Sequence, residues 1–272
     1  MRNMKSKSTF TTNYNITKTY KPITPSLRHR RILKQPDKLL RIKNDSKSLK
    51  NHAGRNRTGT ITTRHHGGRH KRYLRNIDWL RNNANYSLSN LVSIEYDPNR
   101  SSSIARYITS KFKNYYILAP EYIEKSIQGP NYPNERFLIN GDTLPLKDIP
   151  VGSKCYNIQN KRLQKPIFAK SSGSSATLLN IENNIATIRL PSKKIIYINS
   201  LCLATIGSPS NSNKRLTIKG KAGANRWIGR RPTVRGYAMN PFDHPHGGKT
   251  SGGIQPKTKW GKQAKWIKKK SK

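Results

Sequence analysis

The stretch Ala176-Thr-Leu-Leu-Asn-Ile-Glu-Asn-Asn-Ile-Ala-Thr-Ile-Arg-Leu190 decides how the middle of this chain folds. Two apolar runs, 176–181 and 185–190, flank Glu182, Asn183 and Asn184. In the second run, one face would carry Ala186, Ile188 and Leu190, and the other would carry Ile185, Thr187 and Arg189. Alternation of period two is typical of a strand with one buried face, and Asn tolerates the left-handed conformation of tight turns. The stretch therefore predicts a β-hairpin.

Similar signals extend outward from this hairpin over residues 76–213. Val92, Ile94 and Tyr96 alternate with Ser93 and Glu95, which predicts a strand whose buried face carries the three larger side chains. Further short apolar runs lie at 115–119, 136–139 and 195–198. Turn signals separate these runs at 97–99, 129–130, 140–142 and 150–152. Short strands at this spacing favour small β-barrels, and the segment is long enough for two of them.

Charge divides the 272-residue chain into three regions. Residues 1–75 hold 21 basic and 2 acidic side chains, residues 76–213 hold 16 and 9, and residues 214–272 hold 17 and 1. The outer regions have few aliphatic residues and little alternation, as in segments that become ordered only on a partner. We therefore expect a folded middle between two long, extended basic arms.

A formal net charge of +42 calls for a polyanionic partner. No apolar run approaches the ~18 residues that cross a bilayer, and no basic amphipathic helix suited to a lipid surface is evident. The 13 tyrosines, 5 phenylalanines and 4 tryptophans are scattered among the charges, which favours nucleic acid over membrane. Cys155 and Cys202 form no CxxC pair, so we expect two reduced thiols, buried or half-buried, and not a disulfide or a zinc site.

The first dense basic motif runs from Gly54 to Arg72. Its glycines let a backbone approach closely, and its cations suit phosphates. The predicted RNA-binding residues are Arg55, Arg57, Arg64, His65, His66, Arg69, His70 and Lys71. The histidines could instead bind a metal, but such sites recruit Cys or carboxylate partners at defined spacing, and none is nearby. We expect no metal site, and imidazoles that stack on bases or bond to riboses.

The second motif, from Gly220 to Gly236, interleaves glycine, arginine and one indole. Arginine pairs bidentately with phosphate, and Trp offers a face on which a base can stack. The predicted RNA-binding residues are Lys221, Arg226, Trp227, Arg230, Arg231 and Arg235. A solvated loop is the weaker interpretation, because so basic a segment would stay unstructured without a partner.

The third motif, from Ala238 to Gly248, contains Asn240, Asp243, His244 and His246. A hydrolase could use the histidines as acid or base. However, Asp243 and His244 are sequence neighbours whose side chains usually diverge, and no recognisable nucleophile accompanies them. The prolines and glycines predict a rigid loop held in an RNA crevice, with Asn240, His244 and His246 as RNA-binding residues and no catalytic residue.

At these motifs the sequence resembles the family of ribosomal large-subunit protein two, of bacterial or organellar type. The blocks that carry the resemblance include 59–71, 95–101, 117–120, 141–152, 220–236 and 238–248. The most specific is the run Val234-Arg-Gly-Tyr-Ala-Met-Asn-Pro-Phe-Asp-His-Pro-His-Gly-Gly248. The resemblance covers about nine-tenths of the chain and departs from the family at residues 1–19 and 249–253.

The resemblance implies a mainly β protein. Residues 76–141 would form an oligonucleotide-binding (OB) barrel and residues 142–213 an SH3-like barrel, between arms 1–75 and 214–272. It also implies a structural, non-enzymatic component of the large ribosomal subunit, whose partners are large-subunit rRNA, neighbouring ribosomal proteins and the small subunit across the interface. His244 would support the peptidyl transferase region, and Mg²⁺ would be present only through rRNA. The alternative is a free-standing RNA chaperone or regulator.

Composition also bears on location. The chain favours Lys, Asn, Ile and Tyr, whose codons are AT-rich, which suggests an organelle's own genome. We therefore expect a ribosome of the mitochondrial matrix, with a plastid or a bacterial cytoplasm as the alternatives. Residues 1–20 are basic and free of acids but lack the Arg-rich amphipathic period of a transit peptide, so we expect an arm there.

Overall fold

The computed structural model describes residues 17–34, 46–81, 90–109, 114–123, 138–248 and 255–263. The predicted turn at 129–130 and residues 136–137 of one predicted strand lie outside these ranges. The chain divides into a larger unit, residues 1–50 and 71–222, and a smaller unit, residues 51–70 and 223–272. In the described part of the chain, no helix is long and apolar enough to span a membrane.

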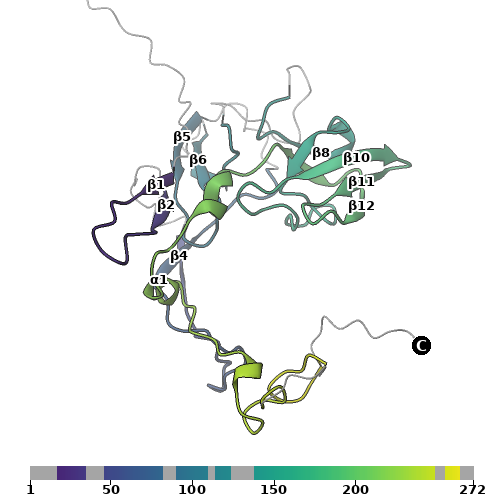
Figure 1. Ribbon diagram of the computed structural model, residues 1–272. Coiled ribbons are helices and arrows are strands. Elements are labelled where there is room, and N and C mark those ends of the chain that lie inside the picture. Colours follow the sequence, from purple (N-terminus) through teal and green to yellow (C-terminus); the bar gives the residue numbers. More distant parts are fainter. Residues whose placement is uncertain are drawn as a thin grey trace, which may run out of the picture. The chain divides into compact units, whose positions relative to one another are not determined.

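The fold is mainly β, as predicted, and its largest sheet lies in the larger unit (Figure 1). Six antiparallel strands are ordered β12-β11-β10-β9-β13-β8. They are β8 (Thr143–Pro145), β9 (Lys154–Tyr156), β10 (Ala176–Glu182), β11 (Ile185–Arg189), β12 (Ile195–Asn199) and β13 (Leu203–Ile206). A short 3₁₀ helix, η2 (Leu146–Asp148), follows β8. The predicted strand at 195–198 is thereby confirmed.

The hairpin predicted at 176–190 is confirmed by β10 and β11. Glu182 pairs with Ile185, which leaves a two-residue loop. Both loop residues, Asn183 and Asn184, have positive φ angles of 46° and 62°. Two left-handed residues in sequence match the twist of the strands, and Asn adopts that conformation more easily than most residues. The alternation is also confirmed, because Ala186 and Ile188 are buried while Ile185 is exposed.

The core of this sheet is built from aliphatic side chains and both cysteines. It includes Leu144, Leu146, Ile149, Cys155, Ile158, Leu178, Ile188, Ile198 and Cys202. Both thiols are free and buried, as the cysteine spacing predicts. Burial raises the pKa of Cys155 to about 11, so this thiol behaves as a packing residue and not as a nucleophile.

A three-stranded antiparallel sheet, β5-β6-β7, forms the second core of the larger unit. Its strands are β5 (Asn90–Glu95), β6 (Ile104–Ile108) and β7 (Asn114–Leu118), and its buried cluster contains Ile94, Ala105, Tyr107, Ile117 and Ala119. The strand predicted around Ile94 is confirmed, but the assignment of Val92 and Tyr96 to its buried face is wrong. Both are exposed. The pairing with β6 shifts between Leu91 and Ser93, so Val92 is the extra residue of a bulge, whereas Tyr96 follows Glu95, the last residue of β5.

Four short strands form where the sequence predicts extended arms without elements. β1 (Thr17–Thr19) pairs with β2 (Arg31–Leu33), and β3 (Ser46–Leu49) pairs with β4 (Arg72–Arg75). Main-chain hydrogen bonds in both directions join Arg31 to Ile218, which follows the 3₁₀ helix η3 (Ser212–Leu216). Parts of the two basic regions therefore pair within the larger unit. The domain boundaries at 75, 141 and 213 remain predictions.

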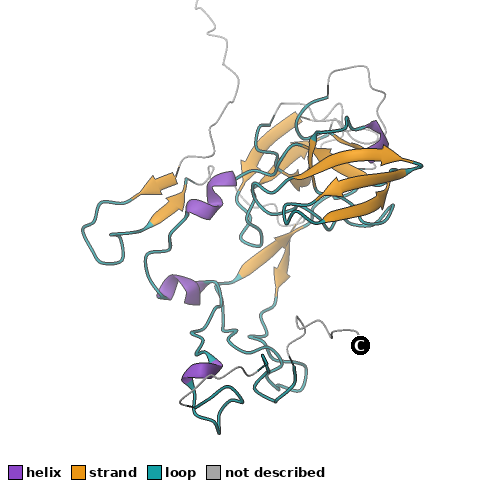
Figure 2. Cartoon of the chain, turned by 45° about the vertical axis from the view of Figure 1, so that its right-hand side comes forward, coloured by secondary structure: helices purple, strands orange, loops and turns teal. Residues whose placement is uncertain are grey.

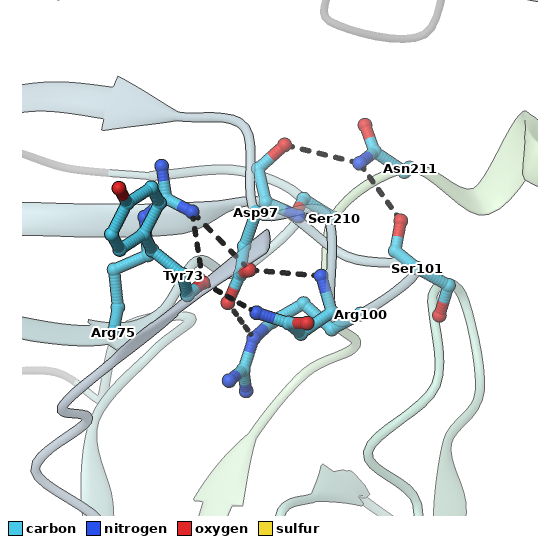
Figure 3. Close-up of polar contacts among 9 residues, drawn as sticks. Tyr73, Arg75, Asp97, Arg100, Ser101, Ser210 and Asn211 are labelled. Atoms are coloured by element: carbon cyan, nitrogen blue, oxygen red, sulfur yellow. Dashed lines mark hydrogen bonds and ion pairs between the residues drawn. The ribbon is translucent and has the colours of Figure 1, made fainter. Parts of the chain in front are cut away.

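A buried carboxylate links β4 to the end of β5 (Figure 3). The side chain of Asp97 is fully buried, and its Oδ2 lies 2.6 Å from Nε of Arg100. A guanidinium nitrogen of Arg75 lies 3.6 Å from Oδ1, which also accepts the Asn99 N–H at 2.9 Å. The side-chain amide of Asn99 donates to the main-chain carbonyl of Tyr73 at 2.6 Å. Asp97 thus fixes the turn predicted at 97–99.

A second polar contact set in Figure 3 joins this turn region to residues 210–211. The hydroxyl of Ser210 accepts the N–H of Ser103 at 3.0 Å. The side-chain amide of Asn211 donates to the Ser101 carbonyl at 3.2 Å and to the Ser103 hydroxyl at 3.0 Å. Residues 101–103 and 210–211 are therefore fastened together although more than 100 positions separate them in the sequence.

Substituting Asp97 tests the importance of this buried carboxylate. Asp97→Ala leaves two partly buried guanidinium groups without their counter-ion, so we expect about 3–5 kcal/mol lower stability of the larger unit. Asp148→Ala, at an exposed aspartate of the same unit, should change stability by less than ~0.5 kcal/mol. Urea denaturation followed by circular dichroism measures both variants, and equal midpoints would contradict the assignment.

Candidate nucleic-acid interface

The first two basic motifs lie side by side in the smaller unit. His66 and Arg230 form an antiparallel β-bridge. Main-chain hydrogen bonds continue the pairing: Gly67 N–H to Gly229 O at 2.9 Å, His70 N–H to Trp227 O at 3.1 Å, and Arg231 N–H to His65 O at 3.0 Å. The ladder is made by main-chain groups, so the pairing of the two segments does not depend on their charged side chains.

Glycine permits this close approach. Gly229 has a φ of 90°, and a Cβ there would lie 3.2 Å from both the Arg69 Cβ and the Gly67 carbonyl oxygen. A Cβ on Gly67 would lie 3.1 Å from Cγ of Arg231. Larger residues would push the two basic segments apart.

His65 fastens the same pairing through its side chain. Its backbone has a φ of 61°, and its Nδ1 lies 3.0 Å from the carbonyl oxygen of Pro232. A carbonyl can only accept, so Nδ1 carries the proton and donates. His65 was predicted as an RNA-binding residue from its type, and the structure gives its ring an internal partner as well.

Side-chain and main-chain bonds build the loop that carries Arg55 and Arg57. Oδ1 of Asn56 accepts hydrogen bonds from the main-chain N–H groups of Thr58 and Thr60, both at 3.0 Å. A Cβ on Gly54 would lie 2.1 Å from the Thr63 carbonyl, so the chain closes tightly at its base. The loop is thereby shaped before any partner arrives, with both arginines exposed.

The structure places most of the predicted RNA-binding residues on the surface of the smaller unit. Those exposed there are Arg55, Arg57, His66, His70, Arg226, Trp227, Arg230, Arg231, Arg235 and Asn240, and those half-buried are Arg64, His65, Arg69 and His244. Trp227, at the end of the short helix α1 (Gly223–Trp227), is 54% exposed. Lys71 and Lys221 are exposed but belong to the larger unit, and His246 is buried.

The third motif forms a closed loop after the 3₁₀ helix η4 (Gly236–Ala238), within the loop-rich smaller unit of Figure 2. The carbonyl of Asn240 accepts the N–H groups of Asp243 at 3.0 Å and His244 at 3.2 Å. The Gly248 N–H reaches the Met239 carbonyl at 3.1 Å and closes the loop. A Cβ on Gly247 would lie 2.2 Å from the Asn240 oxygen, so only glycine fits.

The two imidazoles of this loop are held by main-chain donors. Nδ1 of His244 accepts the His246 N–H at 3.1 Å, and Nε2 of His246 accepts the Lys257 N–H at 2.8 Å. The Gln255 carbonyl lies 3.3 Å from the same Nε2, but an amide N–H can only donate, so this nitrogen is the acceptor. Both rings are therefore neutral, and His244 keeps its proton on Nε2.

Packing reinforces this arrangement. The ring of Tyr237 stacks on His246 with centroids 4.7 Å apart and planes 20° apart, and His246 is 7% exposed. A Cβ on Gly236 would lie 2.6 Å from the His244 ring. Partial burial, then the His246 ring and the cations Arg64 and Lys259, lower the pKa of His244 below its ordinary 6.5.

The loop can donate hydrogen bonds and present a shaped surface, but it lacks the arrangement of an acid–base catalyst. Within the described ranges, no ion pair joins Asp243 to either imidazole. Nor do the described residues contain a group of three or more His, Cys, Asp or Glu side chains that could hold a metal ion. His246, predicted as an RNA contact, is instead the buried side chain that fastens the loop to Lys257.

Sequence reasoning missed Tyr237, Gly236 and Asn56 as parts of the site. They act on neighbouring protein groups and not as cations, so a search for phosphate-binding residues passes over them. The glycines were the available signal, because several of them mark a close approach: Gly54, Gly67, Gly229, Gly236 and Gly247.

The protonation state of His244 can be measured directly. Because the folded pKa is lowered, the folded chain binds fewer protons than the unfolded chain near pH 6.5, and His244 contributes stability above that pH that is lost as pH falls through its folded pKa. We expect ¹⁵N NMR at pH 6.5 to find a larger neutral fraction of His244 in the folded chain than in urea, with the proton of the neutral ring on Nε2. A charged ring at pH 6.5, or a proton on Nδ1, would refute the assignment.

Comparison with known proteins agrees with this picture. Residues 43–127 match the family model described as Ribosomal Proteins L2, RNA binding N-terminal domain. Residues 139–266 match Ribosomal Proteins L2, C-terminal domain. Two similar relatives are the Large ribosomal subunit protein uL2 of Buchnera aphidicola subsp. Schizaphis graminum (strain Sg) and that of Buchnera aphidicola subsp. Acyrthosiphon pisum (strain Tuc7).

Each of these two relatives is 43% identical to this chain over 256 residues, which cover 90% of this chain and 90% of the relative. Such identity across nearly the whole length leaves no large part of the chain outside the match. The chain therefore belongs to the L2 family of ribosomal proteins.

Proposed function

We propose that this protein is a structural component of the large ribosomal subunit that holds rRNA on its two paired basic motifs. As a member of the L2 family it is an rRNA-binding ribosomal protein that acts in translation, and it is not an enzyme. The observation that carries the proposal is the ladder between residues 65–70 and 227–231. It arranges arginines and an exposed indole on a shaped backbone whose two segments, 51–70 and 223–248, contain one acid, Asp243.

The finer architecture is also a proposal. We infer that residues 76–141 form an OB barrel and residues 142–213 an SH3-like barrel, between arms 1–75 and 214–272. The antiparallel order β5-β6-β7, with its bulge, supports the first barrel. The six-stranded sheet supports the second, because β9 pairs with both β10 and β13 and the sheet surrounds a single aliphatic core.

Further partners follow from the same proposal. The protein would also contact neighbouring ribosomal proteins, and it would contact the small subunit across the interface and help the two subunits associate. His244 would support the peptidyl transferase region by positioning RNA. The neutral ring, with Nε2–H as its remaining donor, is consistent with such support. Any Mg²⁺ near the protein would be held by rRNA.

For location, we propose a mitochondrial ribosome in the matrix. The preference for Lys, Asn, Ile and Tyr supports a small AT-rich genome. Similarity to bacterial relatives fits an organelle of bacterial descent and equally fits a plastid or a bacterial cytoplasm. Immunogold labelling of source cells distinguishes these locations.

Salt dependence tests the ionic part of rRNA binding. Each phosphate contact should contribute ~0.7–0.9 to the slope of log affinity against log salt. Arg230→Gln should reduce the slope by about one contact, whereas Arg230→Lys, which keeps the charge, should preserve it. Filter binding to the in vitro transcript of the cognate large-subunit rRNA measures both. A wild-type affinity that does not change with salt would contradict the proposed function.

Trp227 tests the stacking part. Trp227→Ala should weaken rRNA binding by about 1–3 kcal/mol and impair subunit assembly, because a base loses its stacking face. Trp227→Phe keeps an aromatic face and should lie between wild type and the alanine variant. Sucrose gradients of cells that express each variant show the assembly defect, and indistinguishable profiles for all three proteins would count against stacking at this residue. A stable pool of wild-type protein off the ribosome would favour a free chaperone.

A further inference from the structure

Phe242 lies at the tip of the closed loop 239–248 and is 93% exposed. Among the large hydrophobic side chains in the described ranges, none is more exposed. It is not among the residues that the sequence predicts to bind RNA. An exposed phenylalanine is common at flexible tips, so its significance depends on how firmly the loop holds it.

The loop holds Phe242 in a fixed turn. Residues 240–243 form a turn closed by the Asp243 N–H to the Asn240 carbonyl at 3.0 Å, with Pro241 in the second position, where its fixed φ suits the turn. The Gly248–Met239 hydrogen bond closes the base of the loop. Phe242 is therefore presented outward by a rigid support, which reduces the ordering entropy that a partner must overcome.

The side chain of His246 attaches the loop at a second point. His246 is buried beneath Tyr237 and is bonded to the Lys257 N–H at 2.8 Å, so the loop is also attached to residues 255–257. The loop cannot fold Phe242 inward without breaking these contacts. Its exposure is thus built into the structure.

Charge identifies the class of partner. Asp243 is the only acid in residues 51–70 and 223–272, and the cations Arg64 and Lys259 lie close enough to affect the ring of His244. An apolar protein surface would have to approach this positive field without neutralising it, whereas RNA supplies both phosphates and flat apolar bases. Aromatic side chains beside cations bind unpaired bases by stacking.

We propose that the ring of Phe242 stacks on an unpaired base of the large-subunit rRNA, while the surrounding cations bind phosphates. The inference rests on the proposed function and adds a contact made by an apolar ring. It assigns to the third motif an anchor that is distinct from its histidines.

The test compares Phe242→Tyr, Phe242→Leu and Phe242→Ala in the full chain. Each is assayed by filter binding to the in vitro transcript of the cognate large-subunit rRNA, over a range of salt concentrations. Stacking predicts that Tyr keeps near wild-type affinity, whereas Leu and Ala both weaken binding by about 5- to 150-fold. The salt slope should stay unchanged in all three, because no phosphate contact is lost. Thermal unfolding should also be unchanged, since the side chain is exposed.

Two outcomes would overturn the inference. If wild type binds but Leu binds as well as Tyr, the ring is not stacking on a base, although rRNA binding stands. If all three variants bind naked rRNA like wild type and only assembled subunits are defective, the partner is a protein surface. Failure of the wild-type chain to bind would overturn the proposed function itself, and with it this contact.

Discussion

The structure of the smaller unit depends on bringing two positively charged segments together by their backbones. Residues 65–70 and 227–231 are held by main-chain hydrogen bonds that are insensitive to charge, and glycines remove the side chains that would keep the segments apart. The arginines of the two segments carry like charges, which repel one another. Their repulsion remains, however, and only a dense array of negative charge can neutralise it. The same concentration of like charge that opposes the pairing favours a polyanionic partner.

The histidines of the basic motifs form hydrogen bonds within the protein, in addition to any contact they make with RNA. His65 donates to the Pro232 carbonyl, 167 positions away, and His246 accepts from the Lys257 N–H, 11 positions away, so each ring holds two parts of the smaller unit together. His244 accepts from the backbone of His246 and is thereby fixed as a neutral donor. A charged imidazolium would lose these acceptor positions. Histidines in an arginine-rich motif can therefore hold segments of the protein together by hydrogen bonds, although the composition of the motif suggests phosphate binding.

Elements encoded within a few neighbouring residues could be predicted from the sequence, whereas contacts between segments far apart in the sequence could not. The hairpin at 176–190 could be predicted because both the strands and the Asn183–Asn184 turn are encoded within a few residues. The exposure of Val92 could not, because a bulge depends on the register with β6. The strands β1 to β4 use main-chain groups and leave no alternation in the sequence. The choice of site residues by type remains a prediction. The pairing of their two segments could not be predicted, because the segments lie about 160 positions apart and a single sequence offers no signal for it beyond its glycines.

The distribution of buried side chains explains why the two units require different kinds of support. Both apolar clusters belong to the larger unit, which can offset its conformational entropy by burying leucine, isoleucine and tyrosine. In the described part of the smaller unit, no large hydrophobic side chain is buried, and its buried polar residue is His246. Hydrogen bonds alone contribute little net stability in water. The smaller unit therefore has little buried apolar surface of its own to stabilise it, and under the proposed function rRNA bound to its arginines would add stability that a core supplies in the larger unit. Under the proposed function, binding would then stabilise a shape that the unit's own hydrogen bonds and glycines already define.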